Sequence, residues 1–118
     1  MAEFSQFTIT DKAFEVASRF VEEGWFETVK DTGVFAVAFV IRKHFDEVDP
    51  SVLHYSGSSH NFSYSTYDPD GYWEELIKTL YSTDTPRAYF RNLVIWGLEY
   101  MGDEIAKNAT IQISDFVD

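Results

Sequence analysis

Apolar residues recur at helical spacing along much of the chain. A short segment at residues 7–10 alternates apolar and polar side chains and predicts a strand. The next stretch, ending at Gly24, carries apolar side chains at positions 14, 17, 20 and 21, with Thr10 or Asp11 as the N-cap. A longer apolar series at positions 90, 93, 94, 98, 101 and 105 predicts a second amphipathic helix. The pattern therefore favours helices.

Thr28 or Asp31 is expected to start the next segment. In it, residues 34–41 form the longest apolar run, and its eight positions are apolar on every side. Such a run is typical of either a buried helix or a buried strand. We favour the helix, because Arg42, Lys43 and His44 follow at once. Cations in a last helical turn interact favourably with the negative end of the helix dipole.

The middle of the chain is less regular. Pro50 interrupts it, and residues 52–55 and 62–67 alternate around a Ser/Gly turn, which indicates a hairpin or an ordered loop. Asp68 followed by Pro69 predicts a helix start with Asp68 as the N-cap, and Pro86 repeats this signal. Residues 73, 76, 77 and 80 then follow at helical spacing, and residues 110–113 suggest a final strand.

These elements predict one domain over residues 1–118, mainly α with minor β. We expect a small helical bundle of about four helices plus a short hairpin or edge strands. The first residues lack the basic and apolar regions of a signal peptide. A membrane-spanning helix needs about 20 apolar residues. The sequence therefore predicts a soluble cytoplasmic protein with no membrane contact.

Charge changes the picture. The formal net charge is -11, and residues 44–86 hold eight acidic residues against one basic residue. Phosphate binding rewards Lys and Arg, so this balance disfavours nucleic acid as a direct partner. The chain also has no cysteine, which excludes disulfides, thiolate metal sites and cysteine nucleophiles.

Metal sites and hydrolase chemistry have little support in the sequence. His44, His54 and His60 lie near carboxylates, but no two of them share the spacing of a helical or strand metal motif. Residues 58–60 together with Asp68 supply the residue types of a catalytic triad without a nucleophile elbow.

Calcium and phosphate motifs are equally weak. Residues 68–71 resemble the start of a calcium loop, but Thr79 stands where the bidentate Glu belongs, so helix capping is the better interpretation. The glycines are scattered and make no phosphate-binding loop. We therefore expect no enzymatic activity and no cofactor.

One alternative is a DNA-binding regulator. A strand followed by two helices is the order found in ribbon-helix-helix repressors, whose paired strands read the major groove. Gln6, Thr8 and Thr10 would face the bases and can form hydrogen bonds to them. Lys12 is the only basic residue near them, so phosphate contacts are poorly supplied.

Aromatic and acidic residues crowd the central segment, more than a small core can bury. Tyr and Trp are enriched at protein interfaces, and an acidic field steers basic partners. We therefore predict a protein-binding adaptor with a basic partner. A DNA mimic or immunity-type inhibitor is an alternative, and a homo-oligomer contact stays open. The predicted binding residues are Asp46, Glu47, Asp49, Tyr55, Tyr64, Tyr67, Asp68, Asp70, Tyr72 and Trp73.

Three segments resemble a known family. Residues 25–31 contain F-x-T-x-x-D, residues 34–39 contain an F-A-x-A run, and residues 91–100 form a late helix with G-L-E near its end. This pattern is similar to the small accessory proteins associated with bacterial DNA phosphorothioation. The resemblance covers about half of the chain and implies a non-catalytic helper in an anti-phage or DNA-modification system. It transfers no catalytic residue.

Overall fold

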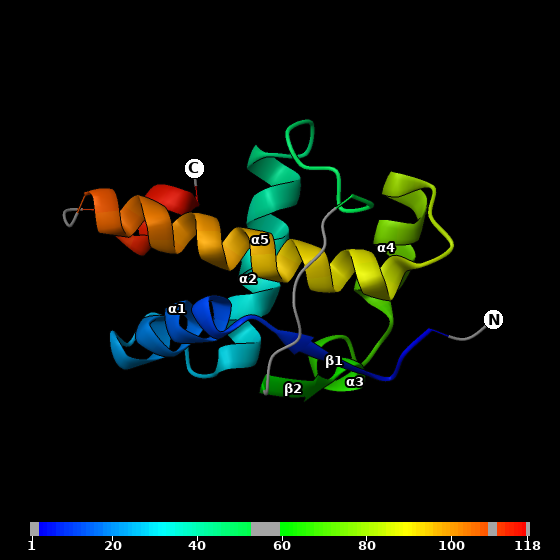
Figure 1. The fold of residues 1–118 in the computed structure, drawn as a ribbon, viewed down its shortest axis with the longest axis horizontal. Helices are drawn as coiled ribbons and strands as arrows, with labels where there is room; N and C mark the ends of the chain where they lie inside the picture. The colour runs from blue at the N-terminus through cyan, green and yellow to red at the C-terminus, as the bar shows by residue number, and fades with distance from the viewer. Residues whose placement is uncertain (1–2, 53–59, 109–110, 118) are drawn as a thin grey trace.

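The computed structural model describes residues 3–52, 60–108 and 111–117. Over these residues helices dominate and the strands are few, so the prediction of a mainly α fold with minor β is confirmed (Figure 1). In chain order the elements are β1 (Gln6–Ile9), α1 (Asp11–Glu22), α2 (Val29–Lys43), β2 (His60–Ser63), α3 (Tyr64–Tyr67), α4 (Tyr72–Tyr81), α5 (Pro86–Lys107) and the 3-10 helix η1 (Ile113–Phe116).

Helix α5 is the centre of the molecule. Helices α1, α2 and α4 all pack against it, and α2 crosses it near its middle (Figure 1). Its inward side chains are fully buried, Phe90, Leu93 and Leu98 among them. Burying each such side chain contributes roughly 1.5–3 kcal/mol, so α5 provides much of the hydrophobic core.

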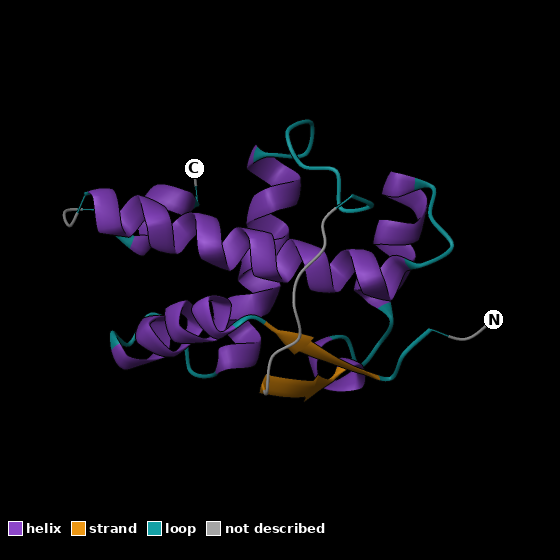
Figure 2. Ribbon diagram, in the orientation of Figure 1, coloured by secondary structure: helices purple, strands orange, loops and turns teal. Residues whose placement is uncertain are grey.

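The two strands form a small antiparallel sheet on one side of α5 (Figure 2). Phe7 lies opposite Phe62, and Ile9 lies opposite His60. Phe7 and Ile9 are buried, as the alternation of residues 7–10 requires for a sheet with one face on the core. The Phe7 ring packs edge-on against the ring of Phe90, 6.4 Å away between centroids. The strand near the N-terminus therefore closes the core over the first half of α5.

Several sequence predictions are confirmed. Residues 34–41 are helical, within α2. The Thr10 hydroxyl accepts the Ala13 backbone N–H at 3.1 Å and caps α1. The Thr28 hydroxyl does the same for Asp31 at 3.2 Å in α2. Pro86 begins α5. Local capping chemistry therefore sets the N-termini of these three helices.

The predicted hairpin or ordered loop lies partly outside the described residues, because residues 53–59 are among those not described. The segment that begins at residue 60 pairs with β1. The alternation expected to continue through residue 67 ends at Ser63, where the helical turn α3 begins. Tyr64 and Tyr67 are three residues apart, so one helical turn points both rings into the core.

The predicted final strand is also wrong. Residues 111 and 112 have no regular structure, and η1 follows them. Gln112 and Asp115 form a reciprocal capping box, with the Gln112 backbone N–H donating to Asp115 at 2.8 Å. This local arrangement favours a helical turn, and it carries Phe116 into the core. None of the described helices is long and apolar enough to cross a membrane.

Candidate functional site

Three of the predicted binding residues are buried. The prediction that Tyr64, Tyr67 and Asp68 are exposed is wrong, because α3 turns both rings inward and Asp68 follows them beneath α4. The rings of Tyr64 and Tyr67 pack against Phe90 at 5.3 and 6.1 Å. These residues build the core and do not offer a partner surface. Tyr55 lies outside the described residues.

Asp68 holds the start of α4 from within. Its carboxylate accepts the Trp73 backbone N–H at 3.1 Å and the Glu74 backbone N–H at 2.9 Å. The Tyr64 hydroxyl also donates to it, at 2.8 Å, and burial together with this carboxylate raises the pKa of Tyr64. The prediction that Asp68 is the N-cap of a helix beginning at Pro69 is wrong, because Gly71 is the N-cap and α4 begins at Tyr72. The Asp68 carboxylate nevertheless accepts two backbone N–H groups of the first turn of α4, where a negative charge is favourable.

The acids of the loop after α2 are exposed. Glu47 contacts the His44 ring, with 2.8 Å between its carboxylate and Nδ1. Asp49 accepts the Ser51 hydroxyl and backbone N–H, and these hydrogen bonds lower the pKa of Asp49. Asp46 is exposed as well. Glu47 and Asp49 make short contacts near the end of α2 and within the loop, and the three exposed acids together produce a negative field.

The same loop lies beside the end of α4. The Phe45 ring is 4.9 Å from the Tyr81 ring between centroids. Asp49 is close enough to Tyr81 to help burial raise the pKa of Tyr81 to about 12. The loop acids 46, 47 and 49, which the sequence predicts to bind a partner, therefore lie on a part of the molecule next to the acidic residues of α4.

Helix α4 exposes apolar side chains. Tyr72 is 63% exposed and Leu80 is 41% exposed, with Leu76 partly exposed between them. The spacing of four residues places the three on one face of the helix. Ile77 is fully buried and Trp73 packs against the core, so the buried face differs from the one that the sequence pattern predicts for Leu80. We call Tyr72, Leu76 and Leu80 the α4 strip.

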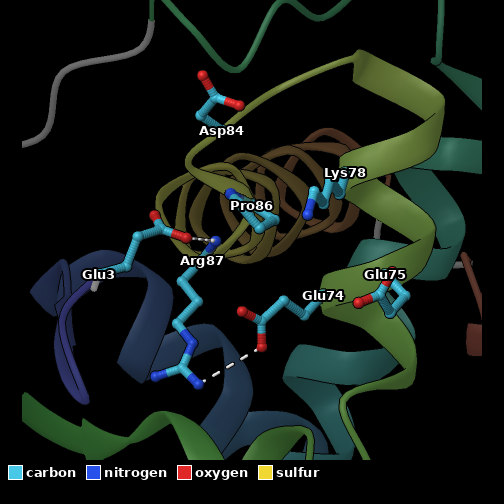
Figure 3. A pocket seen from close by; sticks show the side chains of 7 residues that line it. All are labelled: Glu3, Glu74, Glu75, Lys78, Asp84, Pro86 and Arg87. Carbon is cyan, nitrogen blue, oxygen red and sulfur yellow. Dashed lines mark hydrogen bonds and ion pairs between the residues drawn. The ribbon is translucent and has the colours of Figure 1, made fainter. Parts of the chain in front are cut away.

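A pocket of about 280 Å³ opens beside this helix, where α4 meets the start of α5 (Figure 3). Arg87 lies between two acids. Its guanidinium contacts Glu74 at 3.4 Å, and its backbone N–H donates to Glu3 at 2.8 Å. The guanidinium also donates to the Phe4 carbonyl and lies 4.5 Å from the centre of the Tyr64 ring. Through these contacts, Arg87 holds the N-terminal segment against α5.

Three other acidic residues lie at this pocket or just before α4. Asp70, Glu75 and Asp84 are exposed, and none of them has an ion pair with a described residue. Lys78 is the one further cation that lines the pocket among the described residues. Asp70 and Glu75 stand beside strip residues in the chain, and Asp84 lines the pocket on the flank of α4 that carries Glu74 and Lys78. We use the name α4 corner for Tyr72, Leu76 and Leu80 together with Asp70, Glu75 and Asp84.

The sequence predicted some residues of the α4 corner as binding residues and did not predict others. It named Asp70, Tyr72 and Trp73, and Trp73 turns inward as a packing residue. It missed Leu76 and Leu80, which it assigned to the buried face. The four-residue spacing from Tyr72 is visible in the sequence, but the sequence does not say which of two apolar faces meets α5.

The described residues contain no group of three or more His, Asp or Glu side chains placed to hold a metal ion. His60 stacks on Phe14 at 3.9 Å and lies 3.2 Å from Asp11, while His54 is outside the described residues. Comparison of the chain with protein-family models, curated proteins and solved structures finds no match.

Proposed function

We propose that this chain is a non-enzymatic adaptor or accessory protein that binds a basic protein partner through the α4 corner. The observation that carries the proposal is the α4 strip, an exposed apolar face with free carboxylates beside it. Interfaces join an apolar centre that contributes affinity to a charged rim that contributes specificity. Tyr72, at the start of the strip, is of a residue type enriched at interface hot spots.

Charge selects the kind of partner. Asp70 and Glu75 stand beside the strip, and Asp84 lines the pocket next to α4. The loop that carries Asp46 and Glu47 reaches the end of α4 through the contact between Phe45 and Tyr81. Exposed charges of one sign raise association rates with oppositely charged surfaces, and salt screens this effect. The partner surface that fits is therefore an apolar patch surrounded by Lys and Arg.

The family resemblance supports the same proposal. An accessory protein of a DNA-modification or anti-phage system works among nucleic-acid enzymes, whose binding surfaces are basic. A DNA mimic or immunity-type inhibitor would use the same acidic field and is the closest alternative. It differs in needing the carboxylates without the apolar strip.

The first test is affinity capture from the native host, comparing two double variants. Tyr72→Ala/Leu80→Ala removes the strip, whereas Val52→Ala/Val117→Ala removes two apolar side chains that are also 63% and 41% exposed. We expect a basic protein that the parent and the control retain and that the strip variant loses. Equal recovery with both variants would place the interface elsewhere and contradict the proposal.

The second test measures association rates with that partner. Asp70→Lys/Glu75→Lys/Asp84→Lys is compared with Glu15→Lys/Glu22→Lys/Glu23→Lys on α1, which changes the net charge equally at exposed positions. We expect the α4 variant to associate at least about tenfold more slowly at low salt, and the α1 variant to change less. Equal slowing would indicate a general charge effect. Retention of duplex DNA by the parent protein would favour the ribbon-helix-helix alternative instead.

A further inference from the structure

A second pocket lies on the other half of α5. It has a volume of about 380 Å³ and is formed by the C-terminal end of α2, the second half of α5 and η1. It is larger than the pocket beside α4, and its volume falls within the range of about 300–1,000 Å³ that is common for small-molecule sites. This pocket plays no part in the proposed function, so the two proposals can fail independently.

Aromatic rings form the walls of this pocket. Phe39 and Phe116 meet edge to face at 5.4 Å, and the Tyr100 ring lies 5.8 Å from Phe39 at an angle of 33°. Phe39 and Phe116 are buried, and Trp96 stacks behind Tyr100 at 5.0 Å. Tyr100 is partly exposed and is the accessible aromatic ring of the pocket, with the His44 ring 4.7 Å from it between centroids.

Carboxylates accompany the rings. Glu104 and Asp115 line the pocket, and the Tyr100 hydroxyl donates to Glu104 at 3.4 Å. Burial, Glu104 and Glu47 all raise the pKa of Tyr100, while Lys107, which pairs with Glu104, opposes them. Lys43, the cation in the lining, is exposed on its own helix end.

We propose that this pocket binds an organic cation whose positive charge is carried by an alkylated ammonium group. The negative face of a partly exposed aromatic ring such as Tyr100 attracts such a group, and desolvation makes the attraction stronger. Glu104 and Asp115 add to the attraction and disfavour an anion. The ammonium can come from a free small molecule of the choline type or from an alkylated lysine side chain of another protein.

The test compares choline with 3,3-dimethylbutan-1-ol, an uncharged molecule of the same shape, by calorimetry and by amide chemical-shift mapping of the whole protein. We expect choline to saturate with shifts at Tyr100 and Phe116, and to bind roughly 2- to 30-fold more tightly than the alcohol. A trimethyllysine peptide in a parallel titration distinguishes the two sources of the ammonium, and binding of either supports the site.

Variants assign the binding to named groups. Tyr100→Leu removes a wall and Glu104→Gln removes a charge, and each is expected to weaken choline binding by about threefold or more. Tyr100→Phe keeps the ring and is expected to bind nearly as the parent does. Tyr72→Leu and Glu75→Gln, in the α4 corner, are matched controls expected to change nothing. Equal affinity for choline and the alcohol, no saturable shift, or unchanged binding by Tyr100→Leu and Glu104→Gln would overturn the proposal.

Discussion

At the scale of single residues, the neighbouring tyrosines Tyr64 and Tyr67 have different roles, because their hydroxyl groups differ in hydrogen bonding. Both rings are buried against the first half of α5. The Tyr64 hydroxyl donates to Asp68, whereas the Tyr67 hydroxyl is buried and has no hydrogen-bond partner among the described residues. A buried polar group without a partner costs about 1–3 kcal/mol, and a made hydrogen bond contributes about 1 kcal/mol or somewhat more when charged.

The difference between the Tyr64 and Tyr67 hydroxyl groups predicts different effects of their removal on stability. Tyr64→Phe should lower the free energy of unfolding by about 1–2 kcal/mol, because Asp68 loses a donor while it stays buried. Tyr67→Phe should leave the stability unchanged or raise it, because only an unsatisfied hydroxyl is removed. Urea unfolding of both variants beside the parent measures the difference. A loss for Tyr67→Phe as large as for Tyr64→Phe would mean that its hydroxyl has a partner.

At the scale of elements, the crossing of α2 and α5 depends on a close approach at Gly97. A Cβ atom built at this position would lie 2.9 Å from the Ala36 carbonyl oxygen and 3.0 Å from the Ala36 Cβ. The obstacle is the backbone of the facing helix, which cannot rotate away. The absence of a side chain at Gly97 is therefore what lets the two helices pack so closely.

Gly97→Ala should destabilise the protein by about 1–2 kcal/mol. Alanine favours a helix over glycine by about 1 kcal/mol, but the overpacking cost of about 1–3 kcal/mol exceeds that gain. Gly102→Ala is the control, because its nearest obstacle is the end of the half-buried Val16 side chain, 2.5 Å away. Its loss should be smaller in thermal unfolding. Stability of Gly97→Ala at or above that of the parent would contradict tight packing at the crossing.

At the scale of the whole molecule, charge repulsion opposes folding. The net charge is -11, and the ion pairs of the described residues are mostly at the surface, such as Lys12 with Asp103 at 2.7 Å. Exposed ion pairs contribute about 0–1 kcal/mol each. Repulsion among the excess acids therefore dominates the long-range electrostatics of the folded chain.

Salt should accordingly stabilise the protein. Raising NaCl from about 10 mM to 300 mM shortens the Debye length from roughly 30 Å to below 10 Å and screens the repulsion. We expect the midpoint of thermal unfolding to rise, and KCl to have the same effect as NaCl. Calorimetry at several salt concentrations measures this. A falling midpoint would mean that surface ion pairs stabilise the fold more than the excess acids destabilise it.

The sequence by itself determined the local features of this protein. The sequence was sufficient to predict the caps Thr10 and Thr28, Pro86 as the first residue of a helix, the helical character of residues 34–41 and the strand near residues 7–10. These signals act through hydrogen bonds and side-chain spacing within a few residues, so neighbours along the chain suffice to specify them. The concentration of acidic residues in residues 44–86 is likewise evident from the sequence alone.

Only the tertiary structure decided which side chains meet and which remain outside. It buried Tyr64, Tyr67 and Asp68, exposed Leu80, and paired β2 with a strand more than fifty residues away. It also created both pockets. Burial and pairing depend on contacts between distant segments, and an amphipathic pattern does not reveal which element will cover which face. The α4 corner therefore follows from how α4 packs on α5.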